Sequence, residues 1–230
     1  MAIWYTARRA KKELGLTSDP ILSLTLWIIV SAFIGGKIFF FLESPSTYIA
    51  DPGKMVSSLG AGFVFYGSLI FAIPAIIFFL RKNKIPVWQM FDILALTACI
   101  VHGFGRMGCF FAGCCHGLPS GGPFAIMFSN PECAADIKNV PVHPTQLYEV
   151  AMIIVIAAVL LIIRSRKKFN GQMFLVYIIL YGIGRSIIEI YRGDPARGFI
   201  VQGLISYSQF ISFILVITAL VLYKKLRTTV

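Results

Sequence analysis

Four polar residues with the spacing of one helical face lie at the end of a strongly apolar segment. Tyr181, Arg185, Glu189 and Arg192 follow one another at intervals of four, four and three residues, within or just after residues 171–191. At about 100° per residue, these intervals place a phenol, two guanidiniums and a carboxylate on the same side of a helix. Ionised side chains are costly in an apolar environment and usually serve a function there. The pattern therefore predicts a buried polar site that binds an anion.

A second polar pattern occupies residues 102–117, where His102 and Arg106 share a face if one helix contains both. A planar guanidinium suits a phosphate, because it can donate two parallel hydrogen bonds to it. The segment also holds glycines at positions 103, 105, 108, 113 and 117. They permit close backbone approach, and amide groups after position 108 could face a ligand. The alternative is that the glycines pack helices together while Arg106 pairs with Asp92 or Glu149.

A third pattern, His143-Pro144-Thr145-Gln146-Leu147-Tyr148-Glu149, predicts the start of a helix, because proline is favoured at the first helical position. His143, Gln146 and Glu149 are spaced to share one face of that helix. They offer a titratable imidazole and a hydrogen-bonding amide to an anionic group. The alternative is a purely structural helix start that anchors the chain at the membrane boundary.

The five cysteines allow three interpretations. Cys109, Cys114 or Cys115 could bind a metal ion together with a histidine, or a disulfide could join Cys114 or Cys115 to Cys133. The third interpretation is that the thiols pack as small apolar side chains. The sequence has no C-x-x-C pair and an odd number of cysteines, so we expect packing and no metal site.

The elements that must position these residues are membrane helices. Hydrophobic residues make up 57% of the 230 residues and charged residues only 13%, which excludes an ordinary soluble domain. Residues 61–80 and 198–223 are uncharged runs long enough to cross a bilayer. Four further segments are equally long but contain isolated polar groups. We expect an all-α polytopic membrane protein, a single integral membrane domain over residues 1–230 with about six transmembrane helices, at 21–42, 61–80, 87–112, 145–163, 171–191 and 200–223.

The basic excess, formally +11, reports the topology of these helices rather than a nucleic-acid partner. Fourteen of the 21 lysines and arginines lie in four clusters, at residues 8–12, 81–84, 164–168 and 224–227. The clusters alternate along the six spans, as the positive-inside rule requires when both termini are cytoplasmic. Residues 45–59, 113–143 and 192–202 are then on the outer side. We expect the glycine-rich loop 113–143 to fold back over the membrane, and we expect no cleaved signal peptide.

Together these patterns resemble the bacterial prolipoprotein diacylglyceryl transferase family over nearly the whole chain and in the same order. The matching segments are Gly35-Gly36-Lys37, Phe65-Tyr66-Gly67-Ser68, Gly105-Arg106-Met107-Gly108 with Gly113 and Gly117, His143 to Glu149, the face from Tyr181 to Arg192, and Ser206-x-x-Gln209. Each motif is weak by itself, but together and in register they form a specific signal.

The resemblance implies a multi-pass enzyme of the bacterial cytoplasmic (inner) membrane that moves the diacylglyceryl group of phosphatidylglycerol, or a similar anionic phospholipid, to the cysteine thiol of an exported preprolipoprotein. Arg106 and Arg185 would hold the phosphate, and Glu189 would orient Arg185. Arg192 would bind the headgroup or the departing glycerol phosphate. The other residues implied in substrate binding are His102, Gly117, His143, Gln146, Tyr148 and Tyr181. No metal or other cofactor is implied.

Three departures from the family pattern keep other functions open. Tyr66 stands where the family usually has a histidine that is proposed as the base, and Cys109 and Cys114 replace a polar asparagine and glutamate. The family's additional first helix has no full counterpart, because residues 1–9 align only with its end. Tyr66 would have to accept the proton of the acceptor thiol. The alternatives are a related transferase with a different acceptor and a non-catalytic membrane protein that binds anionic lipid.

Overall fold

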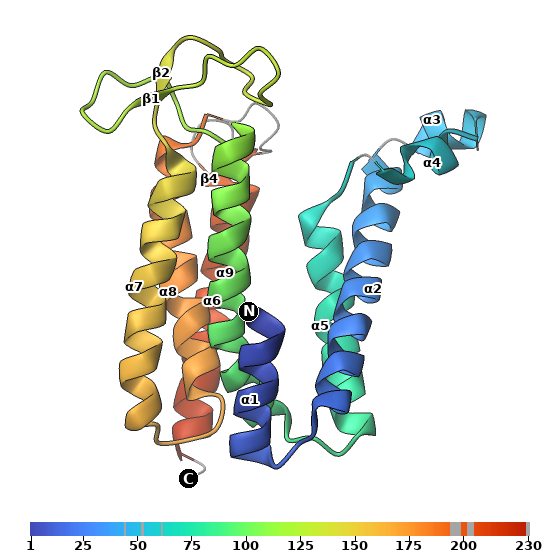
Figure 1. Ribbon diagram of the computed structural model, residues 1–230, viewed down its shortest axis with the longest axis vertical. Helices are drawn as coiled ribbons and strands as arrows, with labels where there is room; N and C mark the ends of the chain where they lie inside the picture. The colour runs from blue at the N-terminus through green and yellow to red at the C-terminus, as the bar shows by residue number, and fades with distance from the viewer. Residues whose placement is uncertain (44, 52, 61, 194–198, 202–204, 229–230) are drawn as a thin grey trace. The chain divides into compact units, whose positions relative to one another are not determined.

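The computed structural model describes residues 1–43, 45–51, 53–60, 62–193, 199–201 and 205–228. Helices make up most of these residues, and the strands are short (Figure 1). The chain divides into two compact units, which consist essentially of residues 3–90 and 91–230. Each unit has its own packing.

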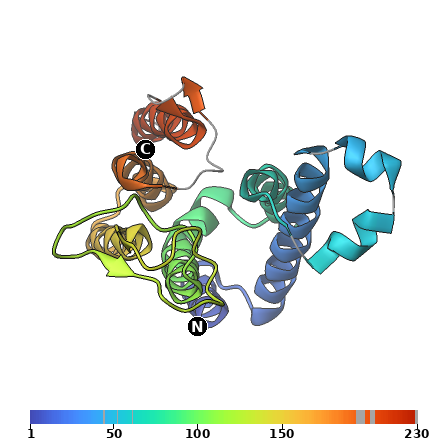
Figure 2. The same cartoon turned by 90° about the horizontal axis from the view of Figure 1, so that it is seen from above.

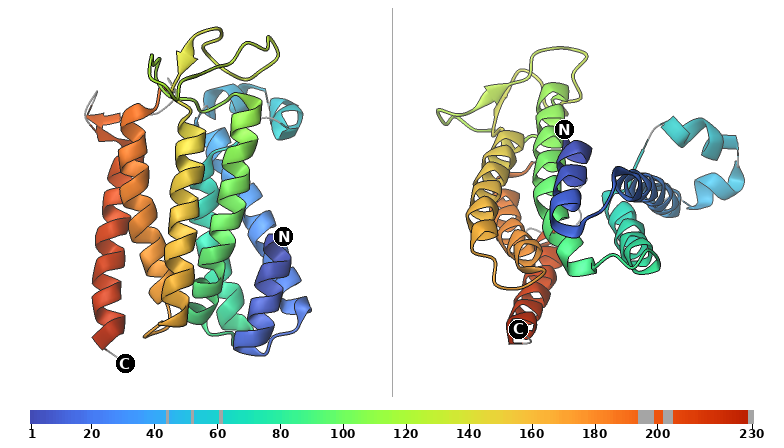
Figure 3. Two further views of the ribbon diagram at one scale, coloured as in Figure 1. Left: turned by 60° about the vertical axis from the view of Figure 1, so that its left-hand side comes forward. Right: turned by 60° about the horizontal axis from the view of Figure 1, so that its bottom comes forward.

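The first unit is built around two long helices, α2 (Ser18–Glu43) and α5 (Phe65–Lys82), which pack along each other (Figure 3). Their contact is close because glycine faces glycine. A Cβ atom on Gly35 would lie 2.3 Å from Gly67 O, and one on Gly67 would lie 2.5 Å from Gly35 O. Small residues permit such an approach between membrane helices. The other helices of this unit are α1 (Ala2–Leu14), α3 (Pro45–Ala50), α4 (Gly53–Ser57) and the 3₁₀ turn η1 (Ser58–Gly60).

Lys37 fixes the connection between α2 and α5. Its side chain is buried, and Nζ donates hydrogen bonds to Ser58 O at 2.8 Å and to Gly62 O at 2.9 Å. The ammonium also lies 5.2 Å from the centre of the Phe40 ring. A lysine within an apolar helix needs carbonyl and aromatic partners, because they offset its lost hydration. Lys37 therefore orders the segment that leads into α5.

The second unit contains nearly all of α6 (Val87–Ala112) together with α7 (Thr145–Ser165), α8 (Gln172–Ile188) and α9 (Tyr207–Thr228). Helix α8 packs between α7 and α9, and α6 lies beside α7 (Figure 2). The long connection from α6 to α7 covers one end of these helices (Figure 1). It contains the antiparallel pair β1 (Ile126–Met127) and β2 (Pro141–Val142), and a second pair, β3 (Phe199–Val201) and β4 (Ile205–Ser206), precedes α9.

Asp92 ties α6 to the beginning of α8. Its Oδ2 accepts a hydrogen bond from the Gly171 amide at 2.8 Å and its Oδ1 accepts one from the Phe174 amide at 3.0 Å. Lys167 Nζ lies 3.2 Å from Oδ2. The carboxylate therefore satisfies two amides that the first turn of a helix leaves without an intrahelical partner. Of the two partners considered for Arg106, Asp92 is thus engaged elsewhere.

Three helix boundaries lie three or more residues inside the predicted spans. The helix of the second span begins at Phe65 rather than near residue 61, and α8 ends at Ile188, where a 3₁₀ turn, η2 (Glu189–Tyr191), follows. Helix α9 begins at Tyr207 rather than at 200, because the residues before it pair as β3 and β4. A capping box fixes that start: the Ser206 amide donates to Gln209 Oε1 at 3.1 Å, and the Gln209 amide donates to Ser206 Oγ at 3.2 Å.

The distribution of side chains is that of a membrane protein. Asp92 and Glu149 are each 1% exposed, whereas Ile154 and Phe213 are 63% and 64% exposed. Among the described residues, five helical segments are long and apolar enough to cross a membrane: α2, α6, α7, α8 with η2, and α9. The predicted class, an all-α polytopic membrane protein, is confirmed. The count of six spans and the cytoplasmic location of both termini remain predictions.

Candidate functional site

A single carboxylate, that of Glu149, gathers four cationic or titratable side chains in the second unit. Glu149 Oε2 lies 2.7 Å from Arg106 Nε and 3.5 Å from His102 Nε2. Glu149 Oε1 lies 3.5 Å from Arg192 Nη1 and 3.9 Å from Arg185 Nε. The two arginines that the sequence singles out for phosphate binding therefore converge on one point. We call this group, with Glu189, the arginine cluster.

Three helices and one turn contribute to the arginine cluster, each by its own periodicity. His102 and Arg106 are one turn apart on α6, which continues without a break to Ala112. Glu149 lies one turn into α7, and Arg185 lies in the last turn of α8. Arg192 directly follows η2, which tightens the chain after α8. The predicted face is thus preserved, although the helix itself ends before Arg192.

The arginine cluster carries more positive than negative charge. Arg185 Nη1 forms an ion pair with Glu189 Oε2, so that two carboxylates serve three guanidiniums. Counting these groups alone, one positive charge is in excess. Burial, and then the neighbouring Arg185 and Arg106, lower the pKa of Arg192 below its ordinary value. An additional anion at this place would relieve the repulsion among the guanidiniums.

The cationic side chains are more accessible than the carboxylate that holds them. The Glu149 side chain is 1% exposed, while the side chains of Arg192, Arg185, Arg106 and His102 are 10%, 12%, 18% and 21% exposed. An anion can therefore approach the guanidiniums while Glu149 fixes them from the enclosed side. Such an arrangement is preorganised, because the donors are held in place before a ligand arrives.

Aromatic residues surround this cluster in two groups. The Tyr181 ring meets His102 edge to face at 5.0 Å and stacks on Tyr177 at 5.9 Å. In the second group, His143 Nδ1 lies 3.0 Å from Tyr148 Oη, and the His143 ring lies 5.2 Å from that of Tyr191. His143 and Tyr148 are therefore partners of each other. Their predicted part in substrate binding remains a prediction.

Gln146 is committed to the loop between α6 and α7. Its Nε2 donates to Cys114 O at 2.7 Å, and Thr145 Oγ1 donates to Cys115 O at 2.9 Å. Both side chains are 1% exposed. Gln146 Oε1 is buried and has no hydrogen-bond partner among the described residues. The donor side of Gln146 therefore anchors the cysteine-containing turn to α7, and the predicted contact of Gln146 with a headgroup remains a prediction.

Gly117 serves close packing in the described structure. A Cβ atom there would lie 2.4 Å from Tyr191 O and 2.7 Å from His143 Cβ, and Gly117 pairs with Arg192 in an isolated β-bridge. Its amide already donates to His143 O at 2.8 Å. By contrast, a Cβ on Gly105 or Gly108 would meet no atom within 4 Å. The expected close approach therefore holds at Gly117 and not at Gly105 or Gly108, where α6 simply continues.

The cysteines are all free thiols. Cys109, Cys114 and Cys115 lie close together where α6 ends, which the sequence spacing did not indicate. Burial, and then the neighbouring Cys115 and Cys109, raise the pKa of Cys114 to about 12. Its thiol is therefore protonated at physiological pH and is by itself a poor nucleophile.

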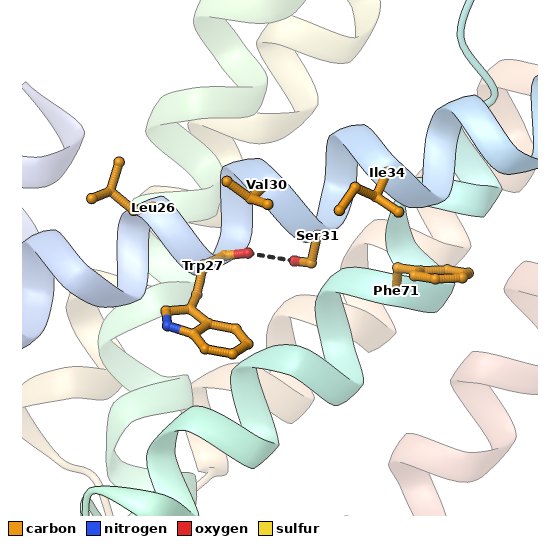
Figure 4. Close-up of a pocket in the computed structure, with 6 residues that line it drawn as sticks. All are labelled: Leu26, Trp27, Val30, Ser31, Ile34 and Phe71. Atoms are coloured by element: carbon orange, nitrogen blue, oxygen red, sulfur yellow. Dashed lines mark hydrogen bonds between the residues drawn. The ribbon is translucent and has the colours of Figure 1, made fainter.

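Tyr66 belongs to the first unit, in the first turn of α5, and its side chain lies outside the described part of the structure. The same unit has an apolar groove along α2, lined by Leu26, Trp27, Val30, Ser31, Ile34 and Phe71 (Figure 4). The hydroxyl of Ser31 is occupied, because it donates to Trp27 O at 2.6 Å. The described lining of this groove can therefore contact apolar chains, and it presents no acidic or basic side chain.

Glu149 has more partners than its place in the sequence predicts. The spacing predicts a partner for Arg106 and a face shared with His143 and Gln146, whereas the carboxylate lies close to His102 and to all three arginines of the cluster. The available signal is its isolation, because it is the one acidic or basic residue within the predicted span 145–163. A lone carboxylate in a membrane helix requires partners from other helices.

Comparisons with known proteins find similarity to one family. The model of the prolipoprotein diacylglyceryl transferase family matches residues 1–224. A phosphatidylglycerol–prolipoprotein diacylglyceryl transferase of Clostridium tetani is 34% identical over 217 residues, which are 94% of this chain and 84% of that relative. A second enzyme of this name, from Clostridium perfringens, is 34% identical over 210 residues, with 91% and 80% covered. One from Finegoldia magna is 29% identical over 220 residues, with 94% and 83% covered.

Proposed function

Because the chain belongs to the prolipoprotein diacylglyceryl transferase family, we propose that it transfers the diacylglyceryl group of phosphatidylglycerol to the cysteine thiol of a prolipoprotein. The observation that carries the proposal is the arginine cluster, in which Arg106, Arg185 and Arg192 surround Glu149. A phosphodiester carries one negative charge. The cluster carries one positive charge in excess, so the two neutralise each other.

The reaction requires a phosphate to leave. The acceptor sulfur forms a bond to the terminal carbon of the diacylglyceryl group, the bond from that carbon to the phosphate oxygen breaks, and glycerol phosphate departs with the electron pair. The departing group gains negative charge, which guanidiniums stabilise more strongly than they stabilise the intact lipid. We assign this role to Arg106 and Arg185, with Glu189 orienting Arg185 and Arg192 contacting the headgroup.

The acceptor thiol must also lose its proton. We assign this step to Tyr66 in its phenolate form, because Tyr66 stands where the family usually has the proposed base. Tyr148, Tyr181, His102, His143 and Gln146 complete the proposed substrate site around the headgroup. We place the protein in the bacterial cytoplasmic (inner) membrane, with the site at its outer face. An exported protein would present its cysteine there.

A transfer assay with purified protein in vesicles tests the proposal. The vesicles contain phosphatidylglycerol labelled in its diacylglyceryl part, and the acceptor is a peptide with one cysteine in a lipoprotein signal context. We expect label to move to this peptide and not to a peptide with serine in place of the cysteine. Arg106→Lys and Arg185→Lys should each lower the rate ~10²-fold or more, because a point charge cannot replace a planar fork.

The exposed Arg166 supplies the matched control, since Arg166→Lys should leave transfer unchanged. Wild-type protein that copurifies with anionic phospholipid but transfers nothing would contradict the proposal. That outcome would instead support a lipid-binding protein without catalysis, which the replacement of the family's base by Tyr66 makes the leading alternative. Transfer to an amine or hydroxyl peptide alone would identify a related transferase with another acceptor.

A further inference from the structure

Three sulfur atoms meet at the end of α6, beside the arginine cluster but not part of it. Cys109 lies in the last turn of α6, and Cys114 and Cys115 lie in the turn that follows. The three Sγ atoms all lie within 4.8 Å of one another. Each of the three side chains is partly exposed, so that an ion from solution can reach them.

The surrounding backbone holds these sulfurs together. Gly113 adopts a positive φ of 81° and Cys115 one of 61°, which reverses the chain sharply after α6. The side chains of Gln146 and Thr145 bind the carbonyl oxygens of Cys114 and Cys115 from α7. The turn is therefore fixed from outside by two hydrogen bonds, in addition to a long one that Cys114 Sγ donates to Cys109 O at 3.7 Å. Its side chains remain available for a ligand.

Three thiols at this separation suit a soft cation. Zinc binds thiolate sulfur at ~2.3 Å in a tetrahedron, which places two such sulfurs ~3.8 Å apart. Rotation of the cysteine side chains can bring the sulfur atoms to this separation. Thiolates favour zinc and its soft analogues, while calcium and magnesium require oxygen ligands.

The electrostatic surroundings favour the same conclusion. Three thiolates and one Zn²⁺ together carry a single negative charge. Cys115 lies within electrostatic range of both Arg106 and Arg192, and Cys109 lies within range of Arg106. Guanidiniums at this range attract the negatively charged metal–thiolate group. We propose that Cys109, Cys114 and Cys115 bind one Zn²⁺ ion and leave its fourth coordination position open to water or another ligand.

This inference stands apart from the proposed transferase activity, because its test reads metal binding only. Full-length protein without a histidine tag is purified in detergent under reducing conditions, treated with a chelator and titrated with Zn²⁺ against a chromophoric competitor. We expect one equivalent of zinc per chain. Cys109→Ser, Cys114→Ser and Cys115→Ser should each weaken the affinity ~10-fold or more, because the loss of a direct ligand costs at least as much as the loss of a residue that supports one. Cys99→Ser removes a buried thiol elsewhere in α6 and should leave binding unchanged.

A second measurement does not depend on whether the variants fold. Cd²⁺ added to the wild-type protein should produce the ultraviolet charge-transfer absorption of a cadmium–thiolate group, with an intensity appropriate to three sulfurs. The inference is overturned if the wild type binds no stoichiometric zinc, if cadmium gives no thiolate absorption, or if the double variant Cys114→Ser/Cys115→Ser binds zinc as the wild type does. A disulfide between any two of the three cysteines in protein purified without reductant would overturn it as well.

Discussion

At the scale of single residues, Glu149 makes the concentration of positive charge in the second unit possible. Burying one guanidinium without a partner costs several kcal/mol, and three close together would also repel each other. Glu149 contacts all three, and Glu189 forms an ion pair with Arg185. The Glu149 carboxylate therefore fixes the positions of the three guanidiniums, which still outnumber the two carboxylates of the cluster. A ligand that carries one negative charge completes the balance.

Replacing Glu149 by glutamine tests this role, because the amide keeps the shape and removes the charge. We expect Glu149→Gln to lower transfer ~10²-fold or more and to destabilise the protein by ~3–5 kcal/mol, as when one partner of a buried ion pair is removed. Thermal unfolding in detergent and the transfer assay measure the two effects. Glu132→Gln, in the exposed loop, is the control and should change neither. Unchanged stability and transfer in Glu149→Gln would show that the arginines do not depend on this carboxylate.

Tyr66 is the second residue whose replacement should have a clear effect on turnover. If its phenol takes the thiol proton or contacts the headgroup, Tyr66→Phe should lower turnover ~10²-fold, as for the loss of one general acid–base group, without loss of folded protein. The alternative is an interfacial tyrosine whose hydroxyl only finds a hydrogen-bond partner. In that case Tyr66→Phe is nearly silent, and Tyr66→His could raise the rate by restoring the family's usual base. Rates of wild type, Phe and His variants with labelled phosphatidylglycerol distinguish the two.

At the scale of elements, glycines permit tight contacts between helices and loops within each unit. Gly35 and Gly67 allow α2 and α5 to touch in the first unit. In the second unit, Gly117 allows the loop after α6 to pass against Tyr191 and His143. That passage places the chain before α7 next to Arg192, which Gly117 contacts through a β-bridge. The loop is therefore a structural support of the arginine cluster.

Alanine substitutions at three glycines test whether the support that this loop gives depends on close packing at Gly117. Gly117→Ala should destabilise the protein by ~1–3 kcal/mol and reduce transfer, because the added methyl group would overlap backbone atoms that cannot move aside cheaply. Gly105→Ala and Gly108→Ala meet open space and should be neutral or stabilising by up to ~1 kcal/mol, since alanine favours the helix. Thermal unfolding of the three variants decides the matter. Equal effects at all three positions would mean that the packing at Gly117 is not what matters.

At the scale of the whole chain, the charge clusters predict an orientation. With both termini in the cytoplasm, the loop 113–143 faces outward and the basic cluster 164–168 faces inward. In protein whose own cysteines are replaced by serine, Ser129→Cys should react with a membrane-impermeant maleimide in intact cells. Arg166→Cys should react only after the membrane is opened. The reverse pattern would place the arginine cluster on the side away from an exported substrate.

The sequence by itself determined the class of fold, the family and the helices that carry the polar residues. These properties depend on composition and on local periodicity, and both can be read along the chain. The face from Tyr181 to Arg192 is predicted from spacing alone, and Arg185 and Arg192 of that face meet at Glu149. The motif Ser206-x-x-Gln209 likewise fixes the start of α9 as a local capping box.

Only the tertiary structure decided which partners the polar groups have. Glu149 lies on α7 and its partners on α6, α8 and the turn after it, so no spacing in the sequence relates them. The same is true of Asp92, which binds the start of α8 rather than Arg106. Cys109, Cys114 and Cys115 lie close together because residues with positive φ reverse the chain after α6. Their spacing in the sequence, which contains no C-x-x-C pair, does not indicate this proximity. Charges and thiols act over short distances in space, whereas a sequence records only distance along the chain.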